Sequence, residues 1–231
     1  MRASSLPSLS ALLLVLLLGA CGGGSVYIGI GDGGDDPPRP SPNPRPDPPT
    51  LSCSAAGLAA SAQSAWPTVC MLTSSGEMVF ELYDRPYAPL SVANFLRYVA
   101  DGYYAGTLIH RVDRDFVIQG GGYTSGHVPK PVPYAPIPLE SNNGLSNLRG
   151  TLAMARRSEP DSATSQFFVN VVDNRALDYQ SATQPGYAVF GRLISGLATL
   201  DAINDVPVYV YSDNDRRPRQ EILIYWVQRL K

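Results

Sequence analysis

Short segments with alternating apolar and polar residues occupy most of the chain after residue 66. They are rich in β-branched and aromatic side chains and end at Gly, Ser, Asp or Asn, as strands joined by turns do. Residues 123–147 interrupt the series and are rich in Pro, Gly, Ser and Asn, which indicates a long surface loop. We expect strands over residues 68–73, 77–83, 107–112, 116–120, 150–155, 166–172, 187–193 and 221–227.

Two segments follow a helical period instead. The first begins at Pro89, which suits the first turn of a helix, and ends before Gly102. The second is shorter and covers about residues 197–204. The apolar stripe of the first helix stands at i, i+3, i+4 and i+7 and consists of Val92, Phe95, Leu96 and Val99.

Many short strands with two helices predict a mainly β fold, either a closed barrel or a sandwich with helical caps. A barrel would remove the open edge strands that can pair with other chains. The sequence from residue 67 to residue 231 is long enough for one domain of this kind.

The N-terminal residues differ from the rest. Residues 1–20 carry one arginine followed by an apolar run too short to span a bilayer, as a secretory signal peptide does. The run ends in Leu18-Gly19-Ala20-Cys21, which resembles a bacterial lipoprotein box, so we expect cleavage before Cys21 and lipid on that cysteine. The alternative is an ordinary cleavage site that leaves a free thiol.

A Gly-rich and then Pro-rich segment, residues 22–50, follows Cys21 and has too little apolar surface to fold alone. Its proline part predicts an extended spacer of roughly 3 Å per residue. We therefore divide the chain into a signal peptide (1–20), a lipidated cysteine with a disordered linker (21–50), an N-terminal extension (51–66) and the domain (67–231). The expected location is the cell envelope, with the domain facing the periplasm; Gly22 favours the outer membrane if the host is Gram-negative.

Composition excludes some function classes. The formal net charge is −2 and the pI about 5.6, so nothing indicates a nucleic-acid partner. Two histidines and three cysteines supply too few ligands for a metal site. In an exported protein, the two cysteines that remain after Cys21 suggest a disulfide between Cys53 and Cys70, with two buried thiols as the alternative.

An arginine and a glutamine, Arg111 and Gln119, stand among apolar residues of the third and fourth predicted strands. Such side chains are costly to bury unless a partner compensates them. Taken alone, these strands could form a plain hairpin whose arginine extends to water.

Five blocks of the chain, in the same order, resemble cyclophilin-type peptidyl-prolyl cis-trans isomerases, in particular their bacterial periplasmic branch. The resemblance covers about residues 67–230. It implies a closed eight-stranded antiparallel β-barrel capped by two α-helices, isomerase activity on Xaa–Pro bonds, and no cofactor or metal. The blocks are residues 88–104, 110–121, 149–155, 161–170, and 177–178 with 187–191.

The resemblance also assigns roles. It makes Arg111 the catalytic arginine and Gln119 the residue that orients it and contacts substrate. The remaining residues implied to bind substrate are Phe116, Val117, Ala155, Arg156, Gln166, Phe168, Leu177 and Tyr187. The chain departs from many relatives at Ala176, where a tryptophan is common, and this puts tight cyclosporin binding in doubt.

We therefore expect a monomeric, lipid-anchored isomerase that acts on proline-containing polypeptides and assists the folding of exported proteins. A proline-peptide-binding chaperone with little turnover is the main alternative, because the pocket positions Ala176, Tyr187 and Arg156 are altered. A further alternative is a protein that binds partners at the cell surface, and the linker over residues 22–50 is the one feature that favours it.

Overall fold

The computed structural model describes residues 48–231. The predicted signal peptide, Cys21 and almost all of the linker lie outside the described residues. Within residues 48–231, none of the helices has the length and apolar character needed to cross a bilayer.

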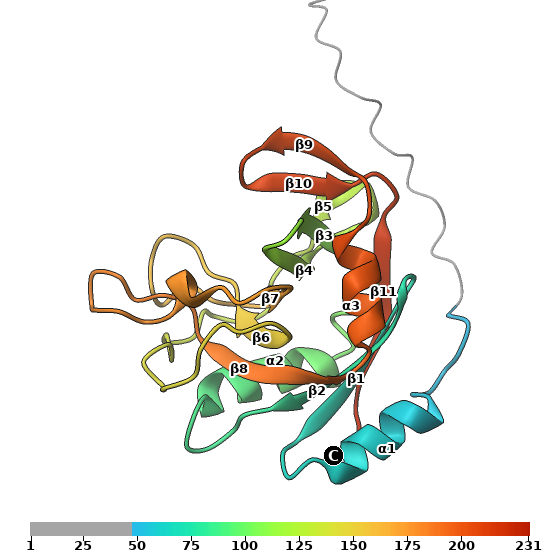
Figure 1. Cartoon of the computed structure of the whole chain (residues 1–231), viewed down its shortest axis with the longest axis horizontal. Coiled ribbons are helices and arrows are strands. Elements are labelled where there is room, and N and C mark those ends of the chain that lie inside the picture. Colours follow the sequence, from blue (N-terminus) through green and yellow to red (C-terminus); the bar gives the residue numbers. More distant parts are fainter. Residues whose placement is uncertain (1–47) are drawn as a thin grey trace, which may run out of the picture. The chain divides into compact units, whose positions relative to one another are not determined.

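Eight antiparallel strands close into a barrel (Figure 1). Their order around the barrel is β3-β11-β1-β2-β8-β6-β7-β4, and the pairing of β3 with β4 closes the ring. The predicted closed barrel is thus confirmed. The strands are β1 (Thr68–Thr73), β2 (Gly76–Leu82), β3 (Thr107–Asp113), β4 (Val117–Thr124), β6 (Thr151–Met154), β7 (Phe167–Asn170), β8 (Val189–Ser195) and β11 (Ile222–Arg229). A two-residue strand, β5 (Val128–Pro129), extends the sheet beyond β4.

Both predicted helices are present and join the core of the barrel. In α2 (Pro89–Ala100) the predicted stripe buries Val92, Phe95 and Val99, and α3 (Leu197–Asn204) buries Leu200 and Ile203. Phe95 contacts the rings of Phe167 and Phe190, with centroids 5.8 and 5.3 Å apart. Fully burying one such side chain contributes about 1.5–3 kcal/mol, so these contacts fix the helices on the barrel.

A third helix, α1 (Ala55–Gln63), occupies the N-terminal extension and was not predicted. Its sequence is rich in Ala and Ser, and only Gly57 and Ser61 are buried, so it has no apolar stripe to reveal it. Polar contacts hold it instead: the Ser54 side chain accepts from Gly57 N–H at its N-terminus, and Ser61 bonds to Thr68 of β1. The extension therefore belongs to the folded unit.

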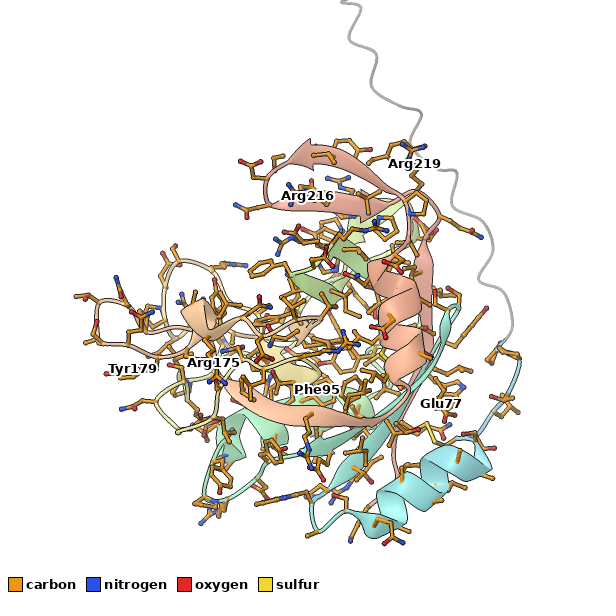
Figure 2. All side chains as sticks on the ribbon, in the orientation of Figure 1. Glu77, Phe95, Arg175, Tyr179, Arg216 and Arg219 are labelled. Atoms are coloured by element: carbon orange, nitrogen blue, oxygen red, sulfur yellow. A yellow bond between two sulfur atoms is a disulfide. The ribbon has the colours of Figure 1, made fainter. Side chains whose placement is uncertain are left out.

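A disulfide bond joins Cys53 to Cys70 of β1, with 6.1 Å between their Cα atoms. Beside it, the Glu77 carboxylate accepts hydrogen bonds from the backbone N–H and the hydroxyl of Ser54 at 2.8 and 2.6 Å. Figure 2 labels Glu77 near the yellow bond between the two sulfur atoms. Together these contacts attach the start of α1 to β1 and β2.

A second element not predicted is a separate hairpin, β9 (Val208–Ser212) and β10 (Asp215–Pro218). It stands apart from the barrel sheet near β3 and β5 (Figure 1). The alternation Val-Tyr-Val-Tyr before the turn residues Asp213-Asn214 is a local strand signal for this hairpin.

His110 on β3 is buried beside the barrel. Its ring lies 4.6 Å from the ring of Tyr123, which in turn stacks on His127 at 4.1 Å. Burial, with smaller effects from His127 and Arg111, lowers the pKa of His110 to about 3, against the opposing influences of the Leu108 backbone and Asp215. His110 is therefore neutral near pH 7 and adds no charge next to Arg111.

This pKa makes folding stability depend on pH. An unfolded histidine titrates near pH 6.5, so between about pH 6.5 and 3 the unfolded chain binds a proton at residue 110 that the folded chain does not. The free energy of unfolding should fall as the pH decreases through this window, by up to about 1.4 kcal/mol per pH unit from this group. His110→Phe keeps a buried ring and should remove this contribution.

Urea unfolding of both proteins at pH 7 and pH 5 measures the effect. The stability of the wild type relative to His110→Phe should be lower at pH 5 than at pH 7. The pKa of His127 is also lowered, mainly by burial, but His127 is present in both proteins. A stability difference that stays the same at the two pH values contradicts the prediction.

Candidate active site

A pocket of about 300 Å³ opens on the outer face of the barrel wall, over β3, β4, β6 and β7. Its lining contains all the residues that the resemblance implied except Gln166, and it adds one residue from the β9–β10 turn. The lining residues are Arg111, Phe116, Val117, Gln119, Ala155, Arg156, Phe168, Leu177, Tyr187 and Asn214.

An irregularity in strand pairing explains why Arg111 faces this pocket. Ile109 pairs with Gly120, and Arg111 pairs with Gln119, so β3 has one more residue than β4 across this step. The extra residue makes a bulge at His110. Ile109 and Val112 both reach the barrel core, whereas Arg111 between them does not. Bulges commonly redirect a side chain beside a functional site, and this one turns Arg111 outward.

Two partners hold the Arg111 guanidinium. One Nη donates to the Asp113 carboxylate at 2.8 Å, and the other donates to Gln119 Oε1 at 3.4 Å. The Arg111 side chain is 15% exposed, and its Nε has no hydrogen-bond partner among the described residues. The Arg111 charge is therefore held in place and largely desolvated. Its Nε–H is buried and has no hydrogen-bond acceptor among the described residues.

Gln166 is not among the residues that line the pocket, but it contacts one that does. Its Oε1 accepts from Gln119 Nε2 at 2.9 Å, which fixes the amide that faces Arg111. Gly122 makes room for it, because a Cβ at that position would lie 2.3 Å from Gln166 Nε2. Gln166 thus acts on Arg111 through Gln119.

The apolar side of the pocket is separate from the barrel core. Val117 and Phe168 belong to a small cluster on the outer face, and Phe116, Leu177 and Tyr187 pack against it. The rings of Phe168 and Tyr187 meet edge to face, 5.5 Å apart. These side chains are therefore not part of the barrel core.

Leu177 reaches the pocket from a short turn, η2 (Arg175–Leu177). The next residue, Asp178, accepts hydrogen bonds from the backbone N–H of Asn147 at 2.7 Å and from its side chain at 2.9 Å. The backbone N–H of Tyr187 donates to Leu177 O at 2.9 Å. The Leu-Asp pair thus ties three loops together around the pocket.

Arg156 forms one rim of the pocket. Its guanidinium lies 4.7 Å from the centre of the Tyr187 ring, and its Nε donates to Gly186 O at 2.9 Å. Ala155 and Arg156 follow the end of β6, where the ladder with β7 ends. The Ala155 N–H still donates to Gln166 O at 3.0 Å, and the Arg157 N–H donates to Ser162 Oγ at 2.8 Å.

Comparison with known proteins decides the family. The family model described as cyclophilin-type peptidyl-prolyl cis-trans isomerase/CLD matches residues 68–229. A peptidyl-prolyl cis-trans isomerase of Acinetobacter baylyi is 49% identical to this chain, and the match covers 68% of this chain and 82% of the length of that protein. Peptidyl-prolyl cis-trans isomerase B of Escherichia coli is 42% identical to this chain, and the match covers 66% of this chain and 93% of the length of that protein. The chain belongs to the cyclophilin family.

A solved structure supports the same conclusion. The Cryptosporidium parvum cyclophilin, crystallised in the presence of the dipeptide Ala-Pro, is 31% identical and has a TM-score of 0.58. The match covers 69% of this chain and 96% of that one. The chain described here is thus a cyclophilin-type peptidyl-prolyl cis-trans isomerase.

Three residues of this cyclophilin's site were missed by sequence reasoning. Asp113 lies just beyond the strand predicted over residues 107–112, and Asn214 and Arg216 lie on the hairpin that was not predicted. Arg216 forms a close ion pair with the Asp113 oxygen that Arg111 leaves open. Asp113 is therefore shared by two arginines from distant parts of the sequence, a pairing that no local pattern reveals.

Asp113→Ala tests how much this carboxylate contributes to holding Arg111. Without it, Arg111 would lose its ionic partner and sample other rotamers, so kcat for a Xaa-Pro tetrapeptide should fall by about tenfold, or about 1.4 kcal/mol. Asp205→Ala is the matched control, because Asp205 is paired with Arg114 but is 68% exposed. Equal activity of the Asp113 variant and the control, at unchanged melting temperature, would exclude this role.

Proposed function

We propose that this cyclophilin catalyses rotation about Xaa–Pro bonds of exported polypeptides at the cell envelope, with Arg111 as the catalytic residue. The observation that carries the assignment is the Arg111 guanidinium, held by Asp113 and Gln119 at the edge of an apolar pocket. The Ala-Pro dipeptide of the related C. parvum structure has the chemistry that such a pocket would accept.

The reaction requires rotation and no bond cleavage. Amide resonance imposes a barrier of roughly 20 kcal/mol on the Xaa–Pro bond, and twisting it removes the resonance. The proline nitrogen then becomes pyramidal and regains a lone pair. A fixed guanidinium donor directed at that nitrogen binds the twisted state better than the planar one, which lowers the barrier.

The surroundings of Arg111 suit this role. An arginine keeps its charge at any working pH, and each Nη carries two N–H groups, so one can remain tied while the other is directed at substrate. Asp113 and Gln119 occupy the two Nη groups, so little reorganisation is needed when the proline nitrogen approaches. Preorganised donors of this kind are the most effective form of electrostatic catalysis.

The apolar wall would hold the proline ring while the acyl side turns. Phe116, Val117, Phe168 and Leu177 line the pocket together with Arg111. The Phe116 ring centre lies 5.9 Å from the guanidinium carbon of Arg111. The apolar side chains also exclude water, which favours the charge-separated planar amide. Substrate backbone would bind beside Ala155 and Arg156, which line the pocket just after β6.

The location is proposed from the sequence. The arginine and apolar run of residues 1–20, the lipoprotein box at Cys21 and the Pro-rich linker are features of an exported protein anchored by lipid. The Cys53–Cys70 disulfide supports an oxidising compartment. We infer that the linker holds the domain near the membrane surface, where newly exported chains fold.

Replacing the catalytic arginine tests the enzyme assignment. Arg111→Ala should lower kcat/KM for a Xaa-Pro tetrapeptide by about 100-fold or more, as loss of a preorganised donor does elsewhere. Arg111→Lys should recover little, because the ammonium lacks the planar fork. Arg114→Ala, in the turn that follows β3, is the control, since Arg114 is 61% exposed. Full activity of Arg111→Ala would refute the assignment, and peptide binding without turnover by the wild type would indicate a binding module instead.

Membrane anchoring has its own test. The protein isolated from its host should begin at Cys21, carry the added mass of acyl chains, and partition into detergent. Cys21→Ser should appear in the aqueous phase with an unchanged domain. An intact mass spectrum that shows an unmodified thiol at residue 21 would favour the ordinary cleavage site.

A further inference from the structure

Among the described residues that line the active-site pocket, two are arginines and none is acidic. Arg111 and Arg156 supply the positive charges, and the other lining residues are apolar, aromatic or neutral polar side chains. The whole chain has a formal net charge of −2, so this local excess of positive charge does not follow from its composition. A ligand that enters the pocket therefore meets positive charge at two places.

The first of these charges, on Arg111, has a counter-charge. Asp113 pairs with Arg111 at 2.8 Å, and the same carboxylate pairs with Arg216 of the β9–β10 hairpin, which Figure 2 labels. Two guanidiniums thus share one carboxylate, and this group of three keeps one net positive charge. In the proposed function Arg111 acts on the proline nitrogen, so it is not the residue that would recognise a neighbouring side chain.

The second charge, on Arg156, has no counter-charge among the described residues. None of the salt bridges within residues 48–231 involves Arg156. Its acceptors are backbone carbonyl groups: Nε donates to Gly186 O at 2.9 Å, and Nη1 donates to Arg157 O and Ser158 O at 2.9 and 3.2 Å. A carbonyl oxygen orients a guanidinium but carries no net charge. The charge of Arg156 is therefore left for water or a ligand to balance.

The acidic residues that follow Arg156 in sequence bind other groups. The Glu159 carboxylate accepts from Ser158 Oγ at 2.9 Å, and the Asp161 carboxylate accepts from the Leu139 N–H at 2.8 Å. Neither carboxylate forms a salt bridge with Arg156, so the loop after β6 supplies no partner for this guanidinium.

The contacts of Arg156 also fix its position at the pocket. The carbonyl bonds use Nε and Nη1, and Nη2 donates to no acceptor within residues 48–231. The guanidinium carbon lies 4.7 Å from the centre of the Tyr187 ring, which is itself part of the pocket lining. Because the group is held before a ligand arrives, little side-chain entropy would be lost when Nη2 binds a carboxylate.

We propose that the Arg156 side chain selects substrates that carry an acidic residue next to the proline. This inference rests on the proposed function of Arg111 and deepens it by naming the substrate class, polypeptide segments with Asp or Glu directly before or after the proline. Arg156 and Arg111 line the same pocket of about 300 Å³. Successive Cα atoms are about 3.8 Å apart, so a residue adjoining a bound proline would lie within side-chain reach of Arg156.

Two pairs of proline tetrapeptides test the proposal. The members of each pair differ only in Glu or Gln, which stands before the proline in one pair and after it in the other. Glu and Gln have nearly the same shape and differ in charge. The measured quantity is the ratio of kcat/KM for the Glu peptide to that for the Gln peptide, taken within each protein at low ionic strength. This ratio cancels any general loss of activity in a variant.

Four variants of the full-length protein are compared with the wild type. Arg156→Gln removes the charge, and Arg156→Met is a second neutral variant that keeps an unbranched stem beside Tyr187 in case Arg156→Gln does not fold. Arg156→Lys keeps the charge. Arg157→Gln is the matched control, because it makes the same change in net charge one residue away, at an exposed position outside the pocket lining.

The wild type should prefer Glu by about fivefold in at least one pair, which corresponds to about 1 kcal/mol for one partly exposed ion pair. The preference should appear mainly in KM and should decrease as salt is added. The neutral variants at Arg156 should bring the ratio to about one, Arg156→Lys should keep part of it, and Arg157→Gln should keep all of it. A wild-type ratio near one in both pairs, or equal ratios in the neutral variants and Arg157→Gln, would overturn the proposal.

Arg111→Ala, measured on the Gln peptides, separates this proposal from the proposed function. Loss of turnover in Arg111→Ala, together with a wild-type ratio near one, would refute selection by Arg156 and leave the role of Arg111 intact. Full turnover in Arg111→Ala would refute the proposed active site, whatever ratio the wild type shows.

Discussion

Pairing of β3 with β4 is the constraint on which both the fold and the site depend. It closes the barrel, so that the ring of eight strands has no free edge at this point. The same pairing places Arg111 opposite Gln119. Because the pairing contains a bulge at His110, the arginine turns outward while its apolar neighbours remain in the core. Closure of the barrel and presentation of the charge thus arise from one piece of backbone.

Electrostatics around Arg111 follow from the need to compensate a partly buried charge. Asp113 supplies the counter-charge and also binds Arg216, so one carboxylate connects the barrel wall to the β9–β10 hairpin. The neutral His110 next in sequence adds no competing charge. The guanidinium is therefore held by fixed groups, as a donor that acts on a twisted amide requires.

Additions to the barrel occur at two places with different consequences. The extension at residues 51–66 adds α1 and a disulfide near β1 and β2, and its contacts are mainly polar. The β9–β10 hairpin instead borders the pocket and contributes Asn214 to its lining. The first addition joins the domain to the linker, and the second alters the surface around the substrate site.

The sequence by itself determined the barrel, the two helices of the core and most of the pocket residues, because alternation, the helical stripe and five ordered blocks are local signals. Helix α1 was not predicted, since it buries few apolar residues and its sequence has no periodic apolar pattern. The β9–β10 hairpin was not predicted either, although the sequence of β9 alternates between valine and tyrosine. Only the tertiary structure decided the bulge that orients Arg111, the sharing of Asp113 with Arg216, and the hydrogen bond from Gln119 to Gln166. These depend on pairing between strands far apart in the chain, and no local pattern encodes that register.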